Sequence, residues 1–241
     1  IPLFKHILMP VIQATQLGKQ YNGTAALSNL NLSIDKGEIF CLLGQNGAGK
    51  TTTINLFLGF TEATSGKATI NDLEVKPNET FTKKYVAYIP EVVQLYGNLD
   101  GIENLDFFSR LAGFKYSKKI LAGFLTKAGL QTEAHEKRLS AYSKGMRQKV
   151  GIAIALAKNA DVILMDEPTS GLDPKATSEF TKICKELATD GKTIFMATHD
   201  IFNAVNVGTR IGIMKGGELV HTINTCDVTA NELQKLYLET I

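Results

Sequence analysis

The sequence has few cysteines and no long apolar run. Its three cysteines, Cys41, Cys184 and Cys226, are too widely spaced for a metal-binding knuckle, and their odd number argues against a disulfide framework. They therefore suit a reducing cytoplasm. No stretch approaches the roughly 20 consecutive apolar residues that a membrane-spanning helix needs. If the protein works at a membrane, we expect another component to anchor it.

The sequence also lacks a strong net charge. The 26 basic and 24 acidic side chains leave a formal charge of +2, which provides no broad positive field for attracting nucleic acid, so we expect no nucleic-acid partner. Internal repeats and low-complexity tracts are absent too. The 241 residues are 44% apolar, enough to bury the core of one large α/β domain with an inserted lobe. Residues 1–11 show no clear period, and we assign them no role.

The first third of the chain predicts two kinds of sheet. Residues 12–34 alternate between apolar and polar, with turn residues Asn22 and Gly23 between two segments, which indicates antiparallel strands. Residues 39–43 form a continuous apolar run, typical of a parallel strand covered on both faces. Further expected elements are a helix over 51–60 and strands over 67–70 and 85–89, the last ending at Pro90.

The middle of the chain changes to a helical period. Apolar residues recur every three or four positions from about residue 98 to 142, which predicts an inserted helical lobe. The α/β pattern then resumes with strands expected over 162–165 and 193–197, each followed by a helix, and an amphipathic helix over 229–238. The predicted fold class is therefore α/β, with an antiparallel β subdomain and an inserted helical subdomain.

A glycine-rich loop follows the first buried strand. Its sequence is Gly44-Gln45-Asn46-Gly47-Ala48-Gly49-Lys50-Thr51, which fits the phosphate-loop pattern between a strand and a helix. Backbone N–H groups of such a loop surround the β-phosphate, Lys50 reaches the β- and γ-phosphates, and the Thr51 hydroxyl binds Mg²⁺. We assign Thr52 to the same site. The alternative, a plain glycine-rich turn, does not account for the flanking strand and helix.

Acidic residues and a histidine follow the two later strands, at the sheet edge where open α/β folds bind ligands. Asp166 is expected to accept from Mg²⁺-bound water, and Glu167 to orient or deprotonate the attacking water. By itself an Asp-Glu pair at a strand end is usually a solvated turn, but the phosphate loop favours the catalytic interpretation. His199 is expected to contact the γ-phosphate. The alternative is an ordinary packed or surface histidine, as we expect for His6, His135 and His221.

Together, these motifs resemble the ATP-binding subunits of ABC transporters, and the likeness runs from about residue 12 to the C-terminus. The most specific element is Tyr142-Ser143-Lys144-Gly145-Met146-Arg147-Gln148, which is similar to the family signature Leu-Ser-Gly-Gly-Gln. The resemblance implies a P-loop NTPase with a RecA-like core. It also implies that Ser143 and Gly145 bind the γ-phosphate of ATP held by a partner subunit, either a second copy or a paired nucleotide-binding subunit.

The resemblance assigns two further residues. Tyr21 matches the aromatic residue that stacks on adenine, although packing at the Asn22-Gly23 hairpin is the alternative. Asp173, in the segment 170–173, matches the loop that communicates across the dimer.

Two departures from the family pattern are Glu91, where glutamine is usual, and Lys144, where glycine is usual. Both resemble the type-2 exporter branch, and Glu91 implies a carboxylate contact to Mg²⁺ in place of an amide. The apolar residues after Glu91 match the region that meets the membrane subunit, with ordinary core packing as the alternative; they are Val92, Val93, Leu95, Tyr96 and Leu99.

The resemblance implies a single ABC ATPase domain over residues 1–241, with a core from 12–97 and 146–241 and a signature lobe from 98–145. We expect a dimer that binds and hydrolyses Mg-ATP to drive export by a separate integral membrane permease. The protein is then cytoplasmic and peripheral on the inner face of the cell membrane. The alternative is an ABC-type ATPase acting on DNA or in translation, but the chain has no basic stripe and only one set of motifs. A GTPase is disfavoured because an Asn-Lys-x-Asp motif is absent.

Overall fold

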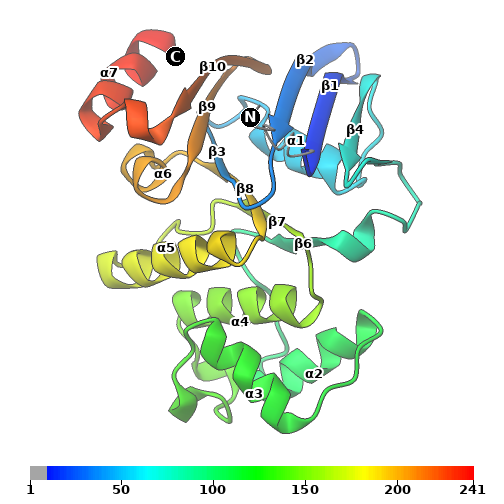
Figure 1. Ribbon diagram of the computed structural model, residues 1–241, viewed down its shortest axis with the longest axis vertical. Coiled ribbons are helices and arrows are strands. Elements are labelled where there is room, and N and C mark those ends of the chain that lie inside the picture. The colour runs from blue at the N-terminus through cyan, green and yellow to red at the C-terminus, as the bar shows by residue number, and fades with distance from the viewer. Residues whose placement is uncertain (1–9) are drawn as a thin grey trace, which may run out of the picture.

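The computed structural model describes residues 10–241 and contains two sheets and a helical lobe (Figure 1). One sheet is antiparallel and has the order β2-β1-β4-β5, which confirms the expected β subdomain. Asn22 and Gly23 form its first turn with φ of 49° and 81°, values that favour Asn and Gly. The strands are β1 (Ile12–Tyr21), β2 (Thr24–Ile34), β4 (Ser65–Ile70) and β5 (Leu73–Glu74).

The second sheet is the centre of the molecule and has six strands in the order β10-β9-β3-β8-β7-β6. All neighbours pair in parallel except β10, which adds antiparallel to β9 at one edge. The strands are β3 (Ile39–Gly44), β6 (Val86–Ile89), β7 (Val162–Asp166), β8 (Thr193–Thr198), β9 (Arg210–Lys215) and β10 (Glu218–Asn224).

Alternating residues of the central strands divide between two hydrophobic cores. Phe40 and Phe195 belong to the core shared with β1, β2 and the helix α1 (Lys50–Phe57), whereas Cys41 and Met196 belong to the core shared with the remaining helices. The two strands that carry these residues, β3 and β8, are buried along their whole length, so apolar side chains occur on both faces. Phe195 stacks on Phe40 at 5.9 Å between ring centroids and meets the edge of Phe57 at 5.5 Å. The continuous apolar runs in the sequence follow from this double coverage.

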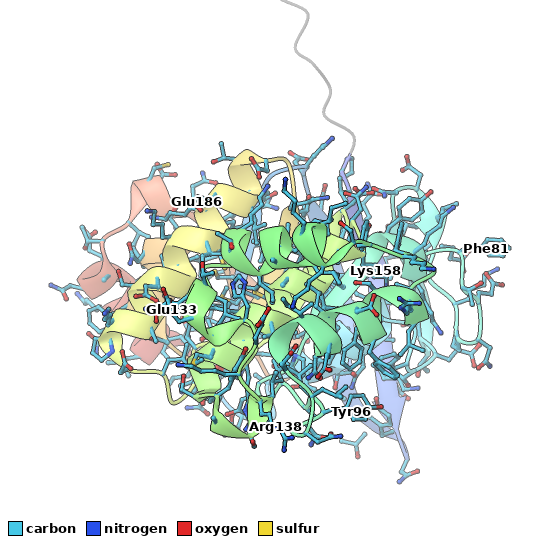
Figure 2. The ribbon with its side chains drawn as sticks, turned by 90° about the horizontal axis from the view of Figure 1, so that it is seen from below. Phe81, Tyr96, Glu133, Arg138, Lys158 and Glu186 are labelled. Atoms are coloured by element: carbon cyan, nitrogen blue, oxygen red, sulfur yellow. The ribbon has the colours of Figure 1, made fainter. Side chains whose placement is uncertain are left out.

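Helices cover the sheet and form the lobe. The lobe packs α2 and α3 against α4, and Figure 2 shows these helices from below. Within residues 10–241 no helix has the length and apolar content to span a bilayer. The helices are α1 (Lys50–Phe57), α2 (Gly101–Leu111), α3 (Lys118–Lys127), α4 (Lys144–Ala157), α5 (Pro174–Thr189), α6 (Ile201–Val207) and α7 (Ala230–Thr240).

Two differences from the predicted boundaries bear on the site. The helix expected over 51–60 is α1, which ends at Phe57 because Gly59 adopts the left-handed conformation with φ of 65°. In addition, α4 runs unbroken across the expected lobe boundary between residues 145 and 146. Ser143 caps this helix, since its hydroxyl accepts from the N–H of Met146 at 3.3 Å. The α4 helix therefore contacts both α2 of the lobe and β6 of the core.

Candidate nucleotide site and comparison with known proteins

The glycine-rich loop connects β3 to α1 and borders a cavity of about 430 Å³. Gly47 and Gly49 both have positive φ, of 83° and 105°. A side chain on Gly49 would lie 2.7 Å from the backbone oxygen of Ala26, so only glycine fits there. No side chain caps the N-terminus of α1. Its first N–H groups are thus available to an anion, as a phosphate-binding loop requires.

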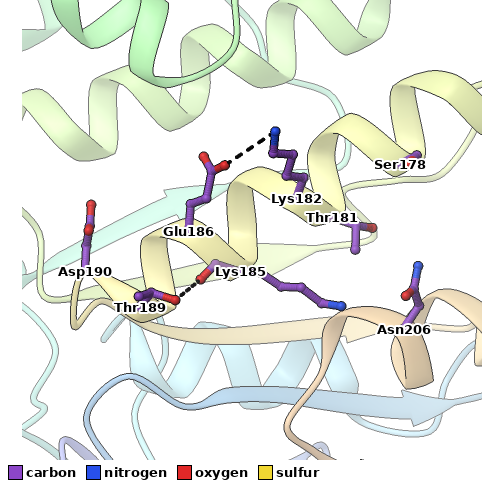
Figure 3. A pocket seen from close by; sticks show the side chains of 8 residues that line it. All are labelled: Ser178, Thr181, Lys182, Lys185, Glu186, Thr189, Asp190 and Asn206. Atoms are coloured by element: carbon purple, nitrogen blue, oxygen red, sulfur yellow. Dashed lines mark hydrogen bonds and ion pairs between the residues drawn. The ribbon is translucent and has the colours of Figure 1, made fainter.

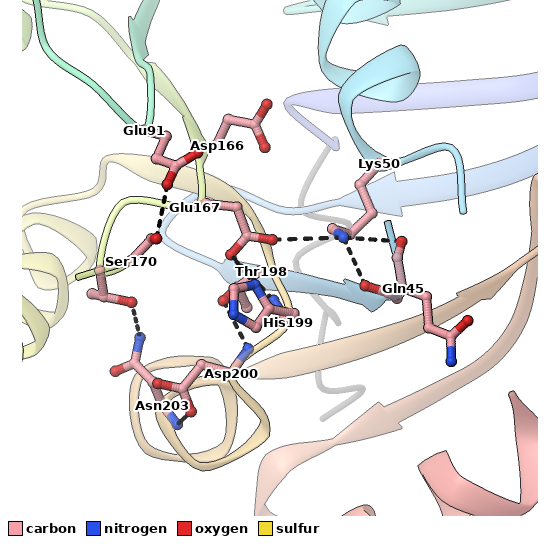
Figure 4. A network of polar contacts seen from close by, with 12 residues as sticks. Gln45, Lys50, Glu91, Asp166, Glu167, Ser170, Thr198, His199, Asp200 and Asn203 are labelled. Carbon is pink, nitrogen blue, oxygen red and sulfur yellow. Dashed lines mark hydrogen bonds and ion pairs between the residues drawn. The ribbon is translucent and has the colours of Figure 1, made fainter. Parts of the chain in front are cut away.

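Lys50 points toward the cavity and is only 6% exposed. Its ammonium donates to the backbone oxygens of Gly44 at 2.6 Å and Gln45 at 3.3 Å, and it lies 3.6 Å from Oε1 of Glu167 (Figure 4). A buried ammonium needs such oxygen partners to offset desolvation. The lysine is therefore held at the phosphate loop, where a phosphate oxygen could replace or join these acceptors.

The residues assigned to Mg²⁺ place oxygen atoms that could bind a metal at one side of the same cavity. The Thr51 hydroxyl donates to Oδ2 of Asp166 at 3.1 Å, and Glu91 also lines the cavity. Within the described part of the chain, no group of three or more His, Cys, Asp or Glu side chains is arranged to hold a metal. The Thr51 and Asp166 oxygens suit a Mg²⁺ ion, which usually takes one or two protein oxygens and completes its coordination with phosphate and water.

Burial raises the pKa of Asp166 above its usual 3.8, and the neighbouring Glu167 and Glu91 carboxylates raise it further. The Thr51 hydrogen bond and the Lys50 ammonium act in the opposite direction. Three carboxylates (Glu91, Asp166 and Glu167) and one ammonium (Lys50) line this cavity, a set of charges that a divalent cation would balance.

Glu167 follows β7 with a positive φ of 44°, which is uncommon for a non-glycine residue. Its Oε2 lies 2.9 Å from Nδ1 of His199 and accepts from the His199 backbone N–H at 3.2 Å. Its Oε1 is buried without a hydrogen bond and lies 3.6 Å from the Lys50 ammonium. One carboxylate oxygen is therefore held by His199, and the other keeps an unused acceptor position beside Lys50. This arrangement suits a general base.

Most of the other residues predicted to bind nucleotide line the cavity around Lys50, which we call the nucleotide cavity. They are Gln45, Asn46, Gly47, Gly49, Thr51 and Thr52. Tyr21 lines it too and is 45% exposed at the end of β1, with the Lys19 ammonium 4.9 Å from its ring centroid. The Lys19 ammonium thus lies over one face of the ring, and the exposed part of the side chain is available for stacking. Gly44 and Ala48 support the loop from beneath: Gly44 through its backbone oxygen, and Ala48 as a 6% exposed core residue.

The signature turn, the segment from Ser143 to Gly145, does not lie at the nucleotide cavity. Ser143 and Gly145 line a separate cavity of about 220 Å³ and do not line the one around Lys50. Asp173, the residue expected to communicate across a dimer, lies in this second cavity and also caps α5 by accepting from the N–H of Ala176 at 2.8 Å. The structure therefore does not bring the two halves of the predicted site together within one chain.

The remaining histidines show why a lone histidine is weak evidence for a site. His135 is buried at 3% exposure, with Nε2 3.1 Å from the backbone oxygen of Leu130, so it is an internal structural residue. His221 is exposed on β10. The prediction for His6 concerns a residue outside the described range.

The structure adds contacts that the sequence analysis did not predict. Ala26 lines the nucleotide cavity although it lies on β2, and no local pattern marks it. Gln148 donates to the backbone oxygen of Glu91 at 3.1 Å. Lys144 Nζ lies 3.7 Å from Oε1 of Glu91. The spacing of Lys144 and Gln148, one helical turn apart, is the only sequence signal for this pair of contacts.

Another cavity, of about 460 Å³, lies beside α5 and α6 (Figure 3). Some of the side chains around it contact one another. Lys182 lies 3.8 Å from Glu186, and the Thr189 hydroxyl donates to the backbone oxygen of Lys185 at 3.0 Å. Nothing in this cavity points to a ligand.

Comparison with known proteins agrees with the site. Residues 27–170, more than half of the chain, match the family described as ABC transporter. The chain is 35% identical to the bacitracin transport ATP-binding protein BcrA of Enterococcus faecalis, over 92% of this chain and 72% of that protein. It is 32% identical to the Nod factor export ATP-binding protein I of Cupriavidus pinatubonensis, over 88% of this chain but only 66% of that protein.

Among solved structures, the dimeric structure of MJ0796, a bacterial ABC transporter cassette, superposes with a TM-score of 0.78 at 29% identity, covering 89% of this chain and 98% of that one. The similarity confirms the predicted P-loop NTPase fold class. The chain therefore belongs to the ABC transporter family, as one of its ATP-binding and ATP-hydrolysing subunits.

Proposed function

We propose that two copies of this chain, or this chain and a paired subunit, enclose Mg-ATP at a shared interface and drive export through a separate membrane permease. One observation carries the proposal: the phosphate loop and the signature turn line different cavities of one chain. A second subunit turned head to tail would place its Ser143 and Gly145 opposite the first subunit's Lys50. The dimeric MJ0796 cassette supports such an assembly.

Within each site the residues have distinct roles. The loop from Gly44 to Thr52 binds the phosphates, Tyr21 stacks on the adenine, and Glu167 accepts a proton from the attacking water. His199, predicted to contact the γ-phosphate, lines the neighbouring cavity with Glu167, and we assign it the role of orienting the Glu167 carboxylate. Thr51, Asp166 and Glu91 would hold Mg²⁺, whose positive charge would offset the negative charge of the phosphates. Closure with ATP and reopening after hydrolysis would move the attached permease between two states, because ATP favours the closed dimer.

An exposed aromatic cluster supports contact with a permease. Tyr96 and Phe107 are 48% and 37% exposed, with ring centroids 4.9 Å apart, and Leu111 is 70% exposed on the same helix as Phe107. Figure 2 labels Tyr96 at the edge of the lobe. By contrast, Val93 is buried in the core. The predicted cluster thus divides, since Val92 and Tyr96 are 60% and 48% exposed whereas Val93 is buried. We propose Tyr96, together with the newly found Phe107 and Leu111, as the docking surface.

Export, rather than import, is supported by the name of one relative, a Nod factor export protein, while another is named as a bacitracin transport protein. Both are transport proteins, which favours transport over the alternative of an ABC-type ATPase on DNA or in translation. A permease partner would also place the chain on the inner face of the cell membrane.

Two experiments test the proposal. Equilibrium titration should show that Lys50→Ala weakens ATP binding by about 100-fold, since several charge-assisted hydrogen bonds are lost. Unchanged affinity would refute the site. Co-expression with the membrane protein of a neighbouring reading frame should allow both to be purified together. Tyr96→Asp with Leu111→Asp should abolish that association without changing ATP affinity, and an unaffected association would refute the docking surface.

A further inference from the structure

Two side chains at the start of α4 hold Glu91 from one direction. Lys144 Nζ lies 3.7 Å from the Glu91 carboxylate, and the Gln148 amide donates to the Glu91 backbone oxygen at 3.1 Å. Residues four apart lie on one helix face, so both contacts come from the same side of α4. Glu91 is therefore held at its backbone and at its side chain by a single rigid element.

The backbone contact is the more buried of the two. Gln148 is 1% exposed, and its amide also donates to the backbone oxygen of Pro90 at 3.3 Å. The Lys144 and Glu91 side chains are 33% and 51% exposed. The first contact fixes where the segment after β6 lies, and the second orients the carboxylate.

A third segment meets the same carboxylate. Ser170, in the loop after β7, donates to Oε1 of Glu91 at 2.8 Å (Figure 4). Glu91 itself lines the cavity around Lys50. The Glu91 carboxylate thus contacts both the loop that leads to Asp173 and the helix that begins at the signature turn, and Glu91 also lines the nucleotide cavity.

The two departures from the family pattern meet in this contact. A neutral glutamine at 91 would have no charge to pair with a lysine at 144, and a glycine at 144 would offer no cation to a carboxylate at 91. The two residues complement each other in charge within one chain.

We propose that Lys144 and Gln148 are positioning residues for Glu91, and that the Lys144 ammonium orients by charge a carboxylate that stands where glutamine is usual. The effect on catalysis rests on the proposed function, in which Glu91 contacts Mg²⁺. The contacts themselves do not.

Hydrogen exchange of the nucleotide-free full chain tests the contacts directly. Lys144→Met should speed exchange of the amides of residues 92–99 and 146–150 by roughly two- to fivefold, the effect expected from losing a half-exposed ion pair. Lys144→Arg should restore the original rates. The control is Lys149→Met, which removes the 2.6 Å pair of α4 with Glu179 but does not touch Glu91. Unchanged exchange in Lys144→Met, or the same change in the control, would overturn the inference.

A double-mutant cycle tests whether Lys144 and Glu91 act as a pair. If they do, Lys144→Met, Glu91→Gln and the double variant should lower kcat by similar factors, with a smaller change in KM. Additive losses would show that the two residues act independently and would overturn the proposal. Because the exchange experiment contains no nucleotide, failure of the chain to bind ATP would refute the proposed function and leave the contacts standing.

Discussion

His199 contacts one carboxylate oxygen of Glu167, Oε2, through both its imidazole and its backbone N–H. The imidazole Nδ1 lies 2.9 Å from Oε2, and the His199 backbone N–H donates to the same oxygen at 3.2 Å. The second oxygen of Glu167 has no hydrogen bond and lies 3.6 Å from Lys50 Nζ. The histidine therefore fixes the carboxylate's orientation and leaves one acceptor facing the phosphate loop.

Glu167→Gln should separate binding from hydrolysis. An amide keeps the size of the side chain but cannot accept a proton, so kcat should fall by about 10²- to 10⁴-fold. ATP affinity should change little because the phosphate loop is intact. Single-turnover kinetics and a binding titration would check both. Glu186→Gln, at an exposed carboxylate paired with Lys182, is the control and should retain full activity. A fully active Glu167→Gln would exclude the general-base role.

Phe195→Ala should strongly destabilise the fold. Phe195 is fully buried between Phe40 and Phe57, so its truncation leaves a cavity and should cost about 3–5 kcal/mol in the free energy of unfolding. Phe81→Ala is the matched control, because Phe81 is 66% exposed and should cost about 0.5 kcal/mol or less. Urea denaturation would measure both. Equal losses would contradict the assignment of Phe195 to the core.

Features of the fold and the site that depend on neighbouring residues in the sequence could be predicted. Continuous apolar runs predicted β3 and β8 because both faces of each strand are covered, and the glycine-rich loop predicted the nearby lysine. The end of α1 was missed because the left-handed conformation of Gly59 depends on the chain around it.

Contacts between distant segments could not be predicted. Ala26 reaches the nucleotide cavity from another sheet, and Lys144 pairs with a residue 53 positions earlier, at 91. Nor does spacing show that Ser143 lines a different cavity from Lys50. That separation depends on how the lobe packs against the core.

The raised pKa of Asp166 predicts a pH dependence of stability. Between the usual value of 3.8 and the higher folded value, the folded state retains a proton that the unfolded state has lost. The contribution of Asp166 to the free energy of unfolding therefore falls as pH rises through this window, and stays constant above it. Asp166→Asn removes this term. Urea denaturation across pH should show the wild type losing stability relative to the variant as pH rises. A constant or reversed difference would contradict the assignment.

The three thiols should differ in reactivity. Burial raises the pKa of Cys41 to about 12 and also raises the pKa of Cys184, whereas Cys226 is exposed. Because the thiolate is the reactive form, a disulfide reagent should modify one thiol rapidly in the native protein and all three after denaturation. Cys226→Ser should remove the fast phase. Rapid labelling of more than one native thiol would show that the core opens readily.

The central claim is that each ATP is bound between two subunits, and scattering of the slow-hydrolysing protein tests it most directly. Light scattering of Glu167→Gln with Mg-ATP should give twice the monomer mass of 26.3 kDa. The same protein with Ser143→Arg should still bind ATP but remain at 26.3 kDa, because the arginine blocks the signature turn. Equal dimerisation of both proteins, or a monomeric Glu167→Gln with ATP bound, would contradict the shared site.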